Sequence, residues 1–407
     1  MTQSLASRHA LTFIFITMLV DTIGLGIIIP VTPRLIAELT GQGISEAARW
    51  GGWLFFVYAL TQFVFAPIIG NLSDHFGRRP VLILSLLALG VDYVLTGLAP
   101  TIGWLFLARF LSGAAGAAYT TVNAYIADIS PPEKRAANFG LTGAAFGIGF
   151  VLGPALGGLI GEYFGPRMPF FAAAALSLAN AAYGAFVLAE SLPPARRRKF
   201  AIWRANPLGA LIALKATPTV LALMSVVVLM RLAHDSLPAT WTYYTIEKFQ
   251  WSSADIGLSL AAVGVLTAIV FGFLTRLVIP RVGEKRAVQL GLLSAALGFA
   301  GYAIATKGWM MFAIMPFWAL NGLATPALNA IMSKGVGDTE QGALQGAIAS
   351  VGSMTSVVAP VLMTSLFAFF TGSNAPIYFA GAAFLAAALF ELGAAGIFTR
   401  LHIADRK

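Results

Sequence analysis

Twelve stretches of apolar residues alternate with short polar segments along the chain. A helix that crosses a bilayer needs about 20 apolar residues, which each stretch supplies within a few residues. The pattern therefore predicts an all-α integral membrane protein with twelve transmembrane helices. The predicted spans are residues 10–35, 50–71, 80–99, 102–126, 138–161, 168–190, 218–240, 254–278, 287–305, 309–332, 343–370 and 374–399.

The longest polar segment, residues 191–217, divides these stretches into two sets of six. It carries two adjacent prolines and a cluster of basic residues, which is typical of a cytoplasmic loop. Loops rich in glycine and arginine follow both the second and the eighth stretch, at residues 70–79 and 272–286. Internal symmetry of this kind is typical of secondary transporters. We therefore expect two pseudo-symmetric six-helix bundles, at residues 1–190 and 218–407, joined by a cytoplasmic linker.

Composition excludes the soluble and disordered classes of protein. The chain is 58% hydrophobic and only 11% charged, against about 25% charged residues in an average soluble domain. It has no cysteine, which excludes disulfides and thiolate chemistry, and its four histidines form no cluster that predicts a metal site. The apolar run from Ala10 is too long for the core of a signal peptide.

The net charge of +9 would suggest nucleic acid as a partner of a soluble protein, but here it indicates orientation. With the N-terminus in the cytoplasm, nineteen of the 26 lysines and arginines lie on the cytoplasmic side and five on the outer side. The remaining two, Arg109 and Arg231, lie within predicted spans. Because cytoplasmic loops collect Lys and Arg, we expect both termini in the cytoplasm and no nucleic-acid partner.

The most specific motif is the loop GNLSDHFGRRP at residues 70–80, between the second and third stretches. Its glycines permit tight turns of the backbone, and Asp74 can pair with a following arginine or cap the next helix. An excess of positive charge on the cytoplasmic side would require only the arginines of this loop. We therefore interpret the loop, called the latch loop below, as a conformational latch. The candidate latch residues are Gly70, Asp74, Gly77, Arg78 and Arg79.

The latch loop resembles the signature loop of the major facilitator superfamily. Leu19–Pro30, Leu107–Gly116 and Gly149–Gly158 resemble motifs of its drug–proton antiporter branch. Gly283–Arg286 and Asp338–Ser350 resemble the tetracycline–proton antiporter group within that branch. The resemblance implies a monomeric exporter of the bacterial inner membrane that exchanges protons for a small amphipathic molecule. It implies no cofactor, since the proton gradient supplies the energy.

The resemblance also implies roles for single residues. Arg109 would be a coupling residue, and Asp92 and Gln62 would line the substrate cavity. The chain departs from the tetracycline group in its ninth predicted helix, where the group carries an acid: no acidic residue occurs between Glu284 and Asp338. The resemblance therefore does not define the drug. The residues that match the antiporter motif are Gly149, Gly153, Pro154, Gly157 and Gly158.

Charged side chains within the spans are the main functional candidates, since each is costly in hydrocarbon unless it is paired or protonated. Asp21 lies near mid-bilayer and is either a proton site or a structural carboxylate. Asp92 and Arg109 lie almost symmetrically about the outer turn 98–103, so they can pair at one depth. Such a pair is either a proton-dependent switch or a permanent link between two helices.

The seventh stretch carries Arg231, His234 and Asp235, whose spacing places them on one helix face. This face predicts a proton or ligand site, because histidine titrates near neutral pH. The alternative is an Arg231–Asp235 pair that only neutralises the helix.

Other polar residues of the spans are ambiguous. The glycines of residues 149–158 either let helices slide or only pack closely. We expect Glu190 and Glu391 to extend towards the membrane surface. A further set either lines a pore or forms interhelical hydrogen bonds: Asn123, Asn321, Asn329 and Gln345.

Three classes of function remain to be compared. A proton-coupled exporter of an amphipathic molecule uses all the features above. A transporter for another solute, such as an organic anion, would use the positive charges of Arg109, Arg231 and His234. A receptor or scaffold needs no charges at mid-bilayer, and an enzyme would need a nucleophile–base pair, a metal cluster or a nucleotide loop, none of which the sequence contains. We therefore expect a transporter and not an enzyme.

Overall fold

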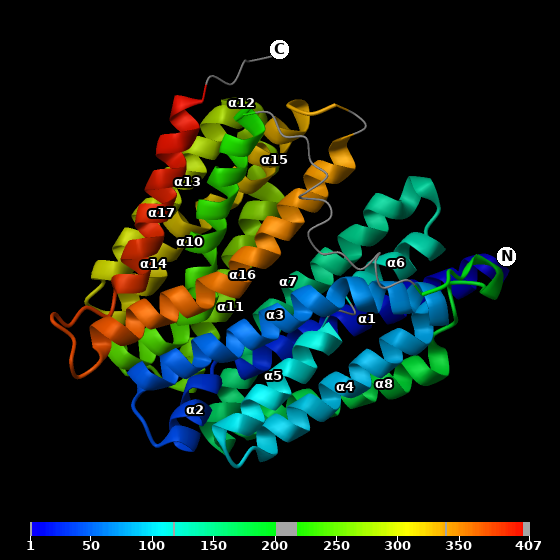
Figure 1. Cartoon of the computed structure of the whole chain (residues 1–407), viewed down its shortest axis with the longest axis horizontal. Helices are drawn as coiled ribbons and strands as arrows, with labels where there is room; N and C mark the ends of the chain where they lie inside the picture. The colour runs from blue at the N-terminus through cyan, green and yellow to red at the C-terminus, as the bar shows by residue number, and fades with distance from the viewer. Residues whose placement is uncertain (1, 117–118, 201–217, 338–339, 402–407) are drawn as a thin grey trace. The chain divides into compact units, whose positions relative to one another are not determined.

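The computed structural model describes residues 2–116, 119–200, 218–337 and 340–401. Helices account for nearly all of these residues, and none of them forms a strand (Figure 1). Twelve helical segments within the described ranges are long and apolar enough to cross a membrane. The prediction of an all-α protein with twelve spans is confirmed.

The N-terminal six spans begin and end close to the predicted residues. The exception is the first span: α1 ends at Ile28, and a turn that contains Pro30 separates it from α2. The predicted end at residue 35 is therefore wrong, because proline does not continue a helix in its interior. The elements are α1 (Thr2–Ile28), α2 (Thr32–Thr40), α3 (Ile44–Phe76), α4 (Arg78–Leu98), α5 (Ile102–Gly116), α6 (Tyr119–Ile129), α7 (Pro132–Phe164), α8 (Met168–Val187) and η1 (Pro194–Arg196).

Two predicted boundaries of the C-terminal six spans are wrong, because α10 continues past residue 240 to Phe249 and α17 begins at Ala382 and not at residue 374. The regular helix is interrupted at two places. A π-helical segment, η3, separates α11 from α12, and a 3₁₀ segment, η4, separates α14 from α15. Interruptions of this kind often mark functional positions. The elements are α10 (Pro218–Phe249), α11 (Ser253–Ile269), η3 (Val270–Leu274), α12 (Thr275–Val282), α13 (Glu284–Ile304), α14 (Gly308–Ala319), η4 (Leu320–Leu323), α15 (Ala324–Lys334), α16 (Gln341–Thr371) and α17 (Ala382–Arg400).

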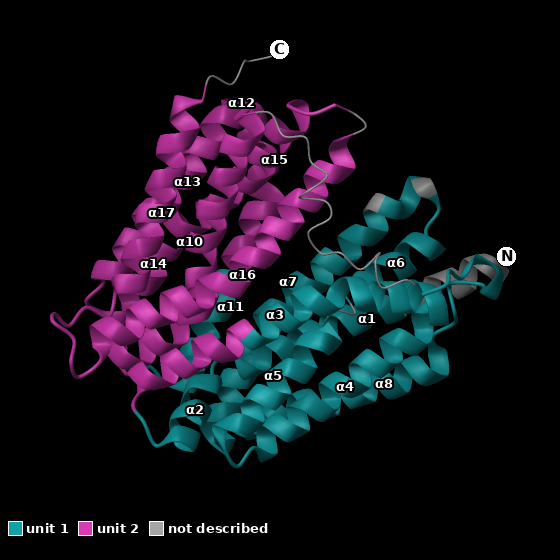
Figure 2. Cartoon of the chain, in the orientation of Figure 1, with its two compact units in different colours: residues 1–42, 57–207, 251–264 teal, residues 43–56, 208–250, 265–407 magenta. Residues whose placement is uncertain are grey.

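The chain forms two compact units, shown in different colours in Figure 2. Unit 1 comprises residues 1–42, 57–207 and 251–264, and unit 2 comprises residues 43–56, 208–250 and 265–407. The first part of α3 belongs to unit 2 and the first part of α11 belongs to unit 1. The expected bundles at residues 1–190 and 218–407 stay a prediction. The role of residues 191–217 as a linker stays a prediction, since residues 201–217 lie outside the described ranges.

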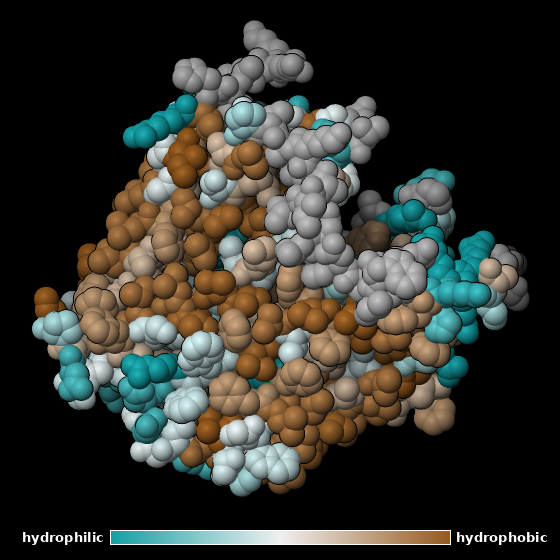
Figure 3. All heavy atoms as spheres, viewed as in Figure 1, coloured by the Kyte–Doolittle hydropathy of each residue, from teal (hydrophilic) through white to brown (hydrophobic). Residues whose placement is uncertain are grey.

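Large apolar side chains are exposed along most helices, and they cover much of the face in Figure 3. Phe186, Tyr163 and Leu84 are among the most exposed. Such surfaces are suited to lipid, since hydrocarbon chains replace water as their environment. Inside each unit, buried alanine, leucine and phenylalanine pack between helices and fix the positions of the polar side chains described next.

Candidate functional site

Asp92 and Arg109 form an ion pair inside unit 1. Nη2 of Arg109 on α5 lies 3.3 Å from Oδ2 of Asp92 on α4. The Asp92 side chain is fully buried and that of Arg109 is 17% exposed. The short turn between α4 and α5 brings both residues to one level, as their symmetric spacing predicts. Oδ1 of Asp92 has no hydrogen-bond partner among the described residues, so this oxygen is available to accept a proton.

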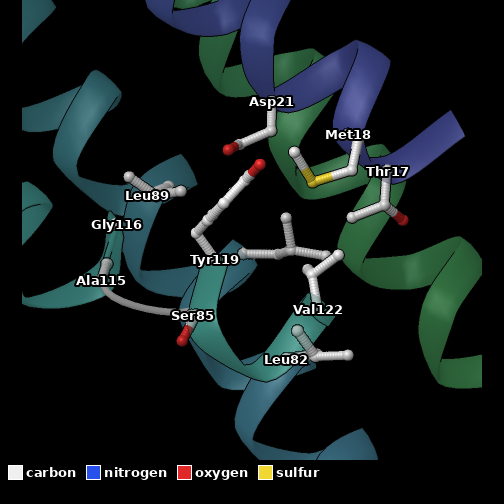
Figure 4. A pocket seen from close by; sticks show the side chains of 11 residues that line it. Thr17, Met18, Asp21, Leu82, Ser85, Leu89, Ala115, Gly116, Tyr119 and Val122 are labelled. Carbon is white, nitrogen blue, oxygen red and sulfur yellow. The ribbon is translucent and has the colours of Figure 1, made fainter. Parts of the chain in front are cut away.

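Asp21 on α1 borders a small cavity enclosed by α1, α4, α5 and α6 (Figure 4). Its carboxylate and the hydroxyl of Tyr119 point towards each other across this space. The cavity measures about 20 Å³, which is enough for about one water molecule and far too small for a drug. Asp21 is half-buried. It lies beside a cavity large enough for one water molecule, which could deliver a proton to its carboxylate.

Two tyrosines connect these acids. Tyr58 on α3 and Tyr93 on α4 each interact electrostatically with Asp21, Asp92 and Arg109. Gln62 donates a hydrogen bond to the Tyr58 hydroxyl at 3.3 Å. Unit 1 thus brings Asp21, Gln62, Asp92 and Arg109 into one polar cluster. Such proximity is required if the four residues act together in proton coupling or in the substrate cavity. Their role in coupling stays a prediction.

The predicted face of α10 is polar and lies in unit 2. Arg231 and His234 are exposed, and Asp235 is half-buried. Oδ2 of Asp235 accepts a hydrogen bond from Ser356 on α16 at 3.0 Å. Within the described ranges, no ion pair joins Arg231 to Asp235, although the charge of Arg231 acts on both His234 and Asp235. The alternative of a directly neutralised pair is therefore not what the structure contains.

His234 also has an aromatic neighbour. Its ring stacks on that of Trp318 on α14, with 6.0 Å between the centroids and 20° between the planes. An exposed imidazole on an indole, beside a guanidinium and a carboxylate, is a surface with both apolar and charged groups. It can bind a molecule that combines a ring system with polar substituents.

Only Gly77 of the latch loop lies outside a helix, because α3 ends at Phe76 and α4 begins at Arg78. An ion-pair network surrounds Arg78. Nη1 of Arg78 lies 2.6 Å from Oδ1 of Asp74 and donates to Ser73 Oγ at 2.6 Å. Nε of Arg78 lies 3.2 Å from Oδ2 of Asp128 at the end of α6. Arg79 donates to the carbonyl of Ala185 on α8. The latch loop therefore ties α3, α4, α6 and α8 together on the side predicted to face the cytoplasm.

Glu190 completes this network. It was expected only to extend towards the membrane surface, but its carboxylate binds the first residues of α4. Its carboxylate accepts the backbone N–H groups of Arg78 and Arg79 at 2.9 and 3.2 Å, so it caps α4. Gly77 adopts φ +107°, and a Cβ there would collide with Oε2 of Glu190. Both facts explain why glycine occupies position 77. Gly70, by contrast, has only Thr120 near its Cβ position.

The glycines of the antiporter motif form two contact faces on α7. Three of them meet the backbone of α1: a Cβ at Gly149 would meet Leu19 O at 3.0 Å, one at Gly153 would meet Ile23 O at 2.8 Å, and one at Gly157 would collide with Ile27 O. Gly158 meets Ser253 and Gly257 of α11 in the same way. Pro154 lies between the faces and packs on Gly26 and Gly257. These helices touch through their backbones, which leaves no room for side chains.

Sequence reasoning missed the acids that act at a distance along the chain. Asp128 and Glu190 reach the latch loop from positions 50 and more than 100 residues away, and no local motif marks them. Glu391 is fully buried, so its predicted extension to the membrane surface is wrong. Asp338 lies outside the described residues. Within the described ranges, no cluster of histidine and acidic side chains could hold a metal ion.

Comparison with known proteins identifies the family of the chain. Residues 14–360 match the family model of the Major Facilitator Superfamily. The class C tetracycline resistance protein of Escherichia coli is 40% identical, over 89% of this chain and 90% of that protein. The class G protein of Vibrio anguillarum is 37% identical, over 89% of this chain and 91% of that protein.

A solved structure shows the same fold. A bacterial homologue of the human lysosomal transporter Spinster has a TM-score of 0.77 at 18% identity, with 97% of this chain and 96% of that chain covered. The relatives are transporters and not enzymes, in agreement with the prediction from the sequence. The chain belongs to the Major Facilitator Superfamily and is a multi-pass membrane transporter similar to tetracycline resistance proteins.

Proposed function

We propose that the protein is a proton-coupled exporter of a small amphipathic, tetracycline-like molecule, working by antiport and alternating access. The observation that carries this proposal is the Asp92–Arg109 pair, buried inside a membrane-spanning unit. Charged groups at this depth are costly and are retained where they transport ions or substrate. The similarity to tetracycline resistance proteins supports the choice of cargo.

The pair gives a simple route from proton binding to a conformational change. A proton on Asp92 removes the negative charge that attracts Arg109, so the link between α4 and α5 weakens. Arg109 can then form a more favourable contact with another acceptor, and a second arrangement of the helices becomes accessible. Asp21, beside its water-sized cavity, lies within the same cluster and supplies a second carboxylate for the proton.

The face of α10 supplies the substrate contacts. His234 and Trp318 offer stacked rings, and Arg231 and Asp235 offer charges of both signs. An amphipathic ring system with polar substituents matches this combination. Cargo bound there and a proton bound at Asp92 would compete through the conformation of the protein, which is the requirement for antiport.

Orientation in the membrane, energy source and oligomeric state complete the proposal. The excess of basic residues in alternate loops supports cytoplasmic termini and a bacterial inner membrane, with lipid against the exposed apolar faces. The energy source is the proton gradient, so no cofactor is required, and a single chain contains both the proton site and the substrate face. We therefore propose a working monomer.

Drug accumulation in cells tests the proposal. Cells that express the protein should accumulate less tetracycline than cells with an empty vector, and a protonophore should abolish the difference. Asp92→Asn should abolish it as well, whereas Glu46→Gln, which changes an exposed acid at the start of α3, should not. Equal accumulation with and without the wild-type protein, over a panel of amphipathic drugs, would contradict the proposal.

A second candidate cargo is an organic anion. The observation that favours it is the exposed guanidinium of Arg231, which forms no ion pair among the described residues. This function predicts that Arg231→Ala abolishes binding of anions and that cationic drugs do not bind. Thermal stabilisation of the purified protein by a panel of drugs, sugars and organic acids separates the two candidates, since a ligand stabilises the state that it binds.

A further inference from the structure

Glu391 is a buried acid in the middle of α17, and the cluster described above does not include it. Its side chain is fully buried within unit 2. Its one recorded hydrogen bond comes from Asn321, whose Nδ2 lies 3.4 Å from Oε1. Two oxygen atoms at this contact, Oε2 of Glu391 and Oδ1 of Asn321, are buried without a hydrogen-bond partner among the described residues.

Among the residues that the structure describes, no cation forms an ion pair with Glu391. The helices packed against α17 are α10, α13 and α16. None of their titratable groups forms an ion pair with Glu391 in the described structure, and the interactions recorded for this carboxyl are its burial and the contact with Asn321. Described residues 341–371 of α16 include no titratable residue. The titratable groups on the other two helices are Arg231, His234, Asp235, Tyr243, Tyr244, Glu247 and Lys248 of α10, and Glu284, Lys285, Arg286 and Tyr302 of α13.

A single proton on Glu391 would give both unpaired oxygen atoms a hydrogen-bond partner. An ionised carboxylate has acceptors only, whereas the Asn321 amide has one donor group and one acceptor in either orientation. The amide N–H can donate to Oε1, but the amide oxygen then has no donor among the described residues. A protonated Glu391 donates its O–H to the amide oxygen and still accepts the amide N–H. Burying an ionised carboxylate without a cation is far less favourable than this neutral pair.

We propose that Glu391 is a proton-binding site of the C-terminal half, with Asn321 as the residue that stabilises its protonated form. The proposal rests on the proton-coupled function above and adds to it a second carboxyl, remote from Asp92. The ligand is a proton, and its binding converts the carboxylate and the amide into a neutral acid–amide pair.

The position of Asn321 explains how the proton could be released. Asn321 lies in η4, the 3₁₀ segment between α14 and α15. The neighbouring Gly322 packs on Val270 and Phe271 of the π-helical segment η3. Two irregular segments therefore meet beside the acid. Because such segments adopt alternative hydrogen-bond patterns readily, a change in η4 would remove the amide from Glu391 and leave the proton without its acceptor.

The same segment connects Glu391 to the proposed substrate face. Trp318 lies three residues before Asn321, at the end of α14, and its ring stacks on His234. A ligand that displaces this stack would act on Trp318 and thereby on η4. Substrate at His234 and the proton at Glu391 are in this way linked through one short segment of chain.

Infrared spectroscopy of the purified full-length protein tests the proton site without any need for transport. A protonated carboxyl has a carbonyl band separate from that of a carboxylate, and the band shifts in heavy water. We expect Glu391→Gln to remove one such band and Glu247→Gln to leave it in place, because Glu247 accepts a hydrogen bond from exposed Tyr378 at the end of its helix. An unchanged band in Glu391→Gln would overturn the proposal.

Stability provides a second measurement. The amide introduced by Glu391→Gln would donate an N–H to Asn321 and accept one, as the protonated acid does, so this variant should melt close to the wild type. Glu391→Leu leaves the amide of Asn321 buried and unpaired and should melt clearly lower. If Glu391→Gln melts as low as Glu391→Leu, the site needs a charge and the proposal is wrong.

Transport in vesicles then separates this proposal from the proposed function. Wild-type flux that ignores a pH gradient would refute proton coupling and leave the infrared result standing. If the wild type responds to the gradient, we expect Glu391→Gln to bind substrate but to lose part of that response. An undiminished response in Glu391→Gln would refute the coupling role of Glu391 alone.

Discussion

The first and fifth helices of the two halves pack against each other by different means. In the N-terminal half, glycines of α7 meet the backbone of α1 at Leu19, Ile23 and Ile27. In the C-terminal half, the corresponding helices are α10 and α16, and a side-chain hydrogen bond from Ser356 to Asp235 connects them. A backbone contact tolerates no added atom, whereas a side-chain contact can break and reform. The C-terminal pair is therefore the one that can respond to a ligand.

Among the described residues, two acids are fully buried, and their partners differ. Asp92 lies beside Arg109, and Glu391 lies beside the neutral amide of Asn321. A cation stabilises the ionised acid, whereas an amide of this kind stabilises the protonated one. Protonation therefore breaks a contact in one half, and loss of a proton breaks a contact in the other. Three substitutions test these contrasts.

The largest effect is expected from Asp92→Ala. It leaves Arg109 without its partner in a mostly buried position, and breaking a buried pair costs about 3 to 5 kcal/mol of stability. Thermal and denaturant unfolding of the purified protein measure the loss. Glu46→Ala is the control, since its pair with Arg49 is exposed and is worth no more than about 1 kcal/mol. Similar losses for the two variants would contradict the structural weight given to Asp92.

A smaller effect is expected from Gly157→Ala on α7. The added methyl group would collide with the backbone of Ile27, and overpacking of this kind costs about 1 to 3 kcal/mol. Gly147→Ala on the same helix has nothing within 4 Å of its Cβ position and should be neutral or slightly stabilising. The unfolding midpoints of both variants, with transport rates beside them, check the contrast. A neutral Gly157→Ala would mean that the contact of α1 with α7 is loose.

The smallest effect is expected from Ser356→Ala on α16. It removes one hydrogen bond to Asp235, which contributes about 0.5 to 1.5 kcal/mol. Substrate affinity, followed by thermal stabilisation or fluorescence, should change more than stability does. Ser353→Ala is a matched control, because its hydroxyl only bonds to the Ala349 carbonyl of the same helix. If both variants bind substrate alike, Asp235 does not contribute to the substrate face.

The sequence predicts the fold well because each span carries its own apolar signal. The Asp92–Arg109 contact also follows from local information, since one short turn sets the depth of both residues. The end of α1 was predicted too late because the apolar run continues through Pro30, where the helix stops. Hydropathy does not detect this interruption, although the fixed φ of proline explains it.

Contacts between distant residues were not predictable in the same way. Glu190 caps α4 from a position 112 residues away, and Glu391 meets Asn321 across 70 residues. Glu190 lies near the end of an apolar stretch, where extension to the membrane surface is the usual outcome, whereas Glu391 lies in the middle of one. Only the packing of the helices shows which of them is buried.

The most direct test of proton coupling is a proton measurement in vesicles that contain the purified protein and a pH-sensitive dye. Substrate added outside should move protons out of the vesicle as it enters, and Asp92→Asn, with its fold verified by melting, should abolish this proton movement. Substrate entry into wild-type vesicles with no opposite movement of protons would contradict the account.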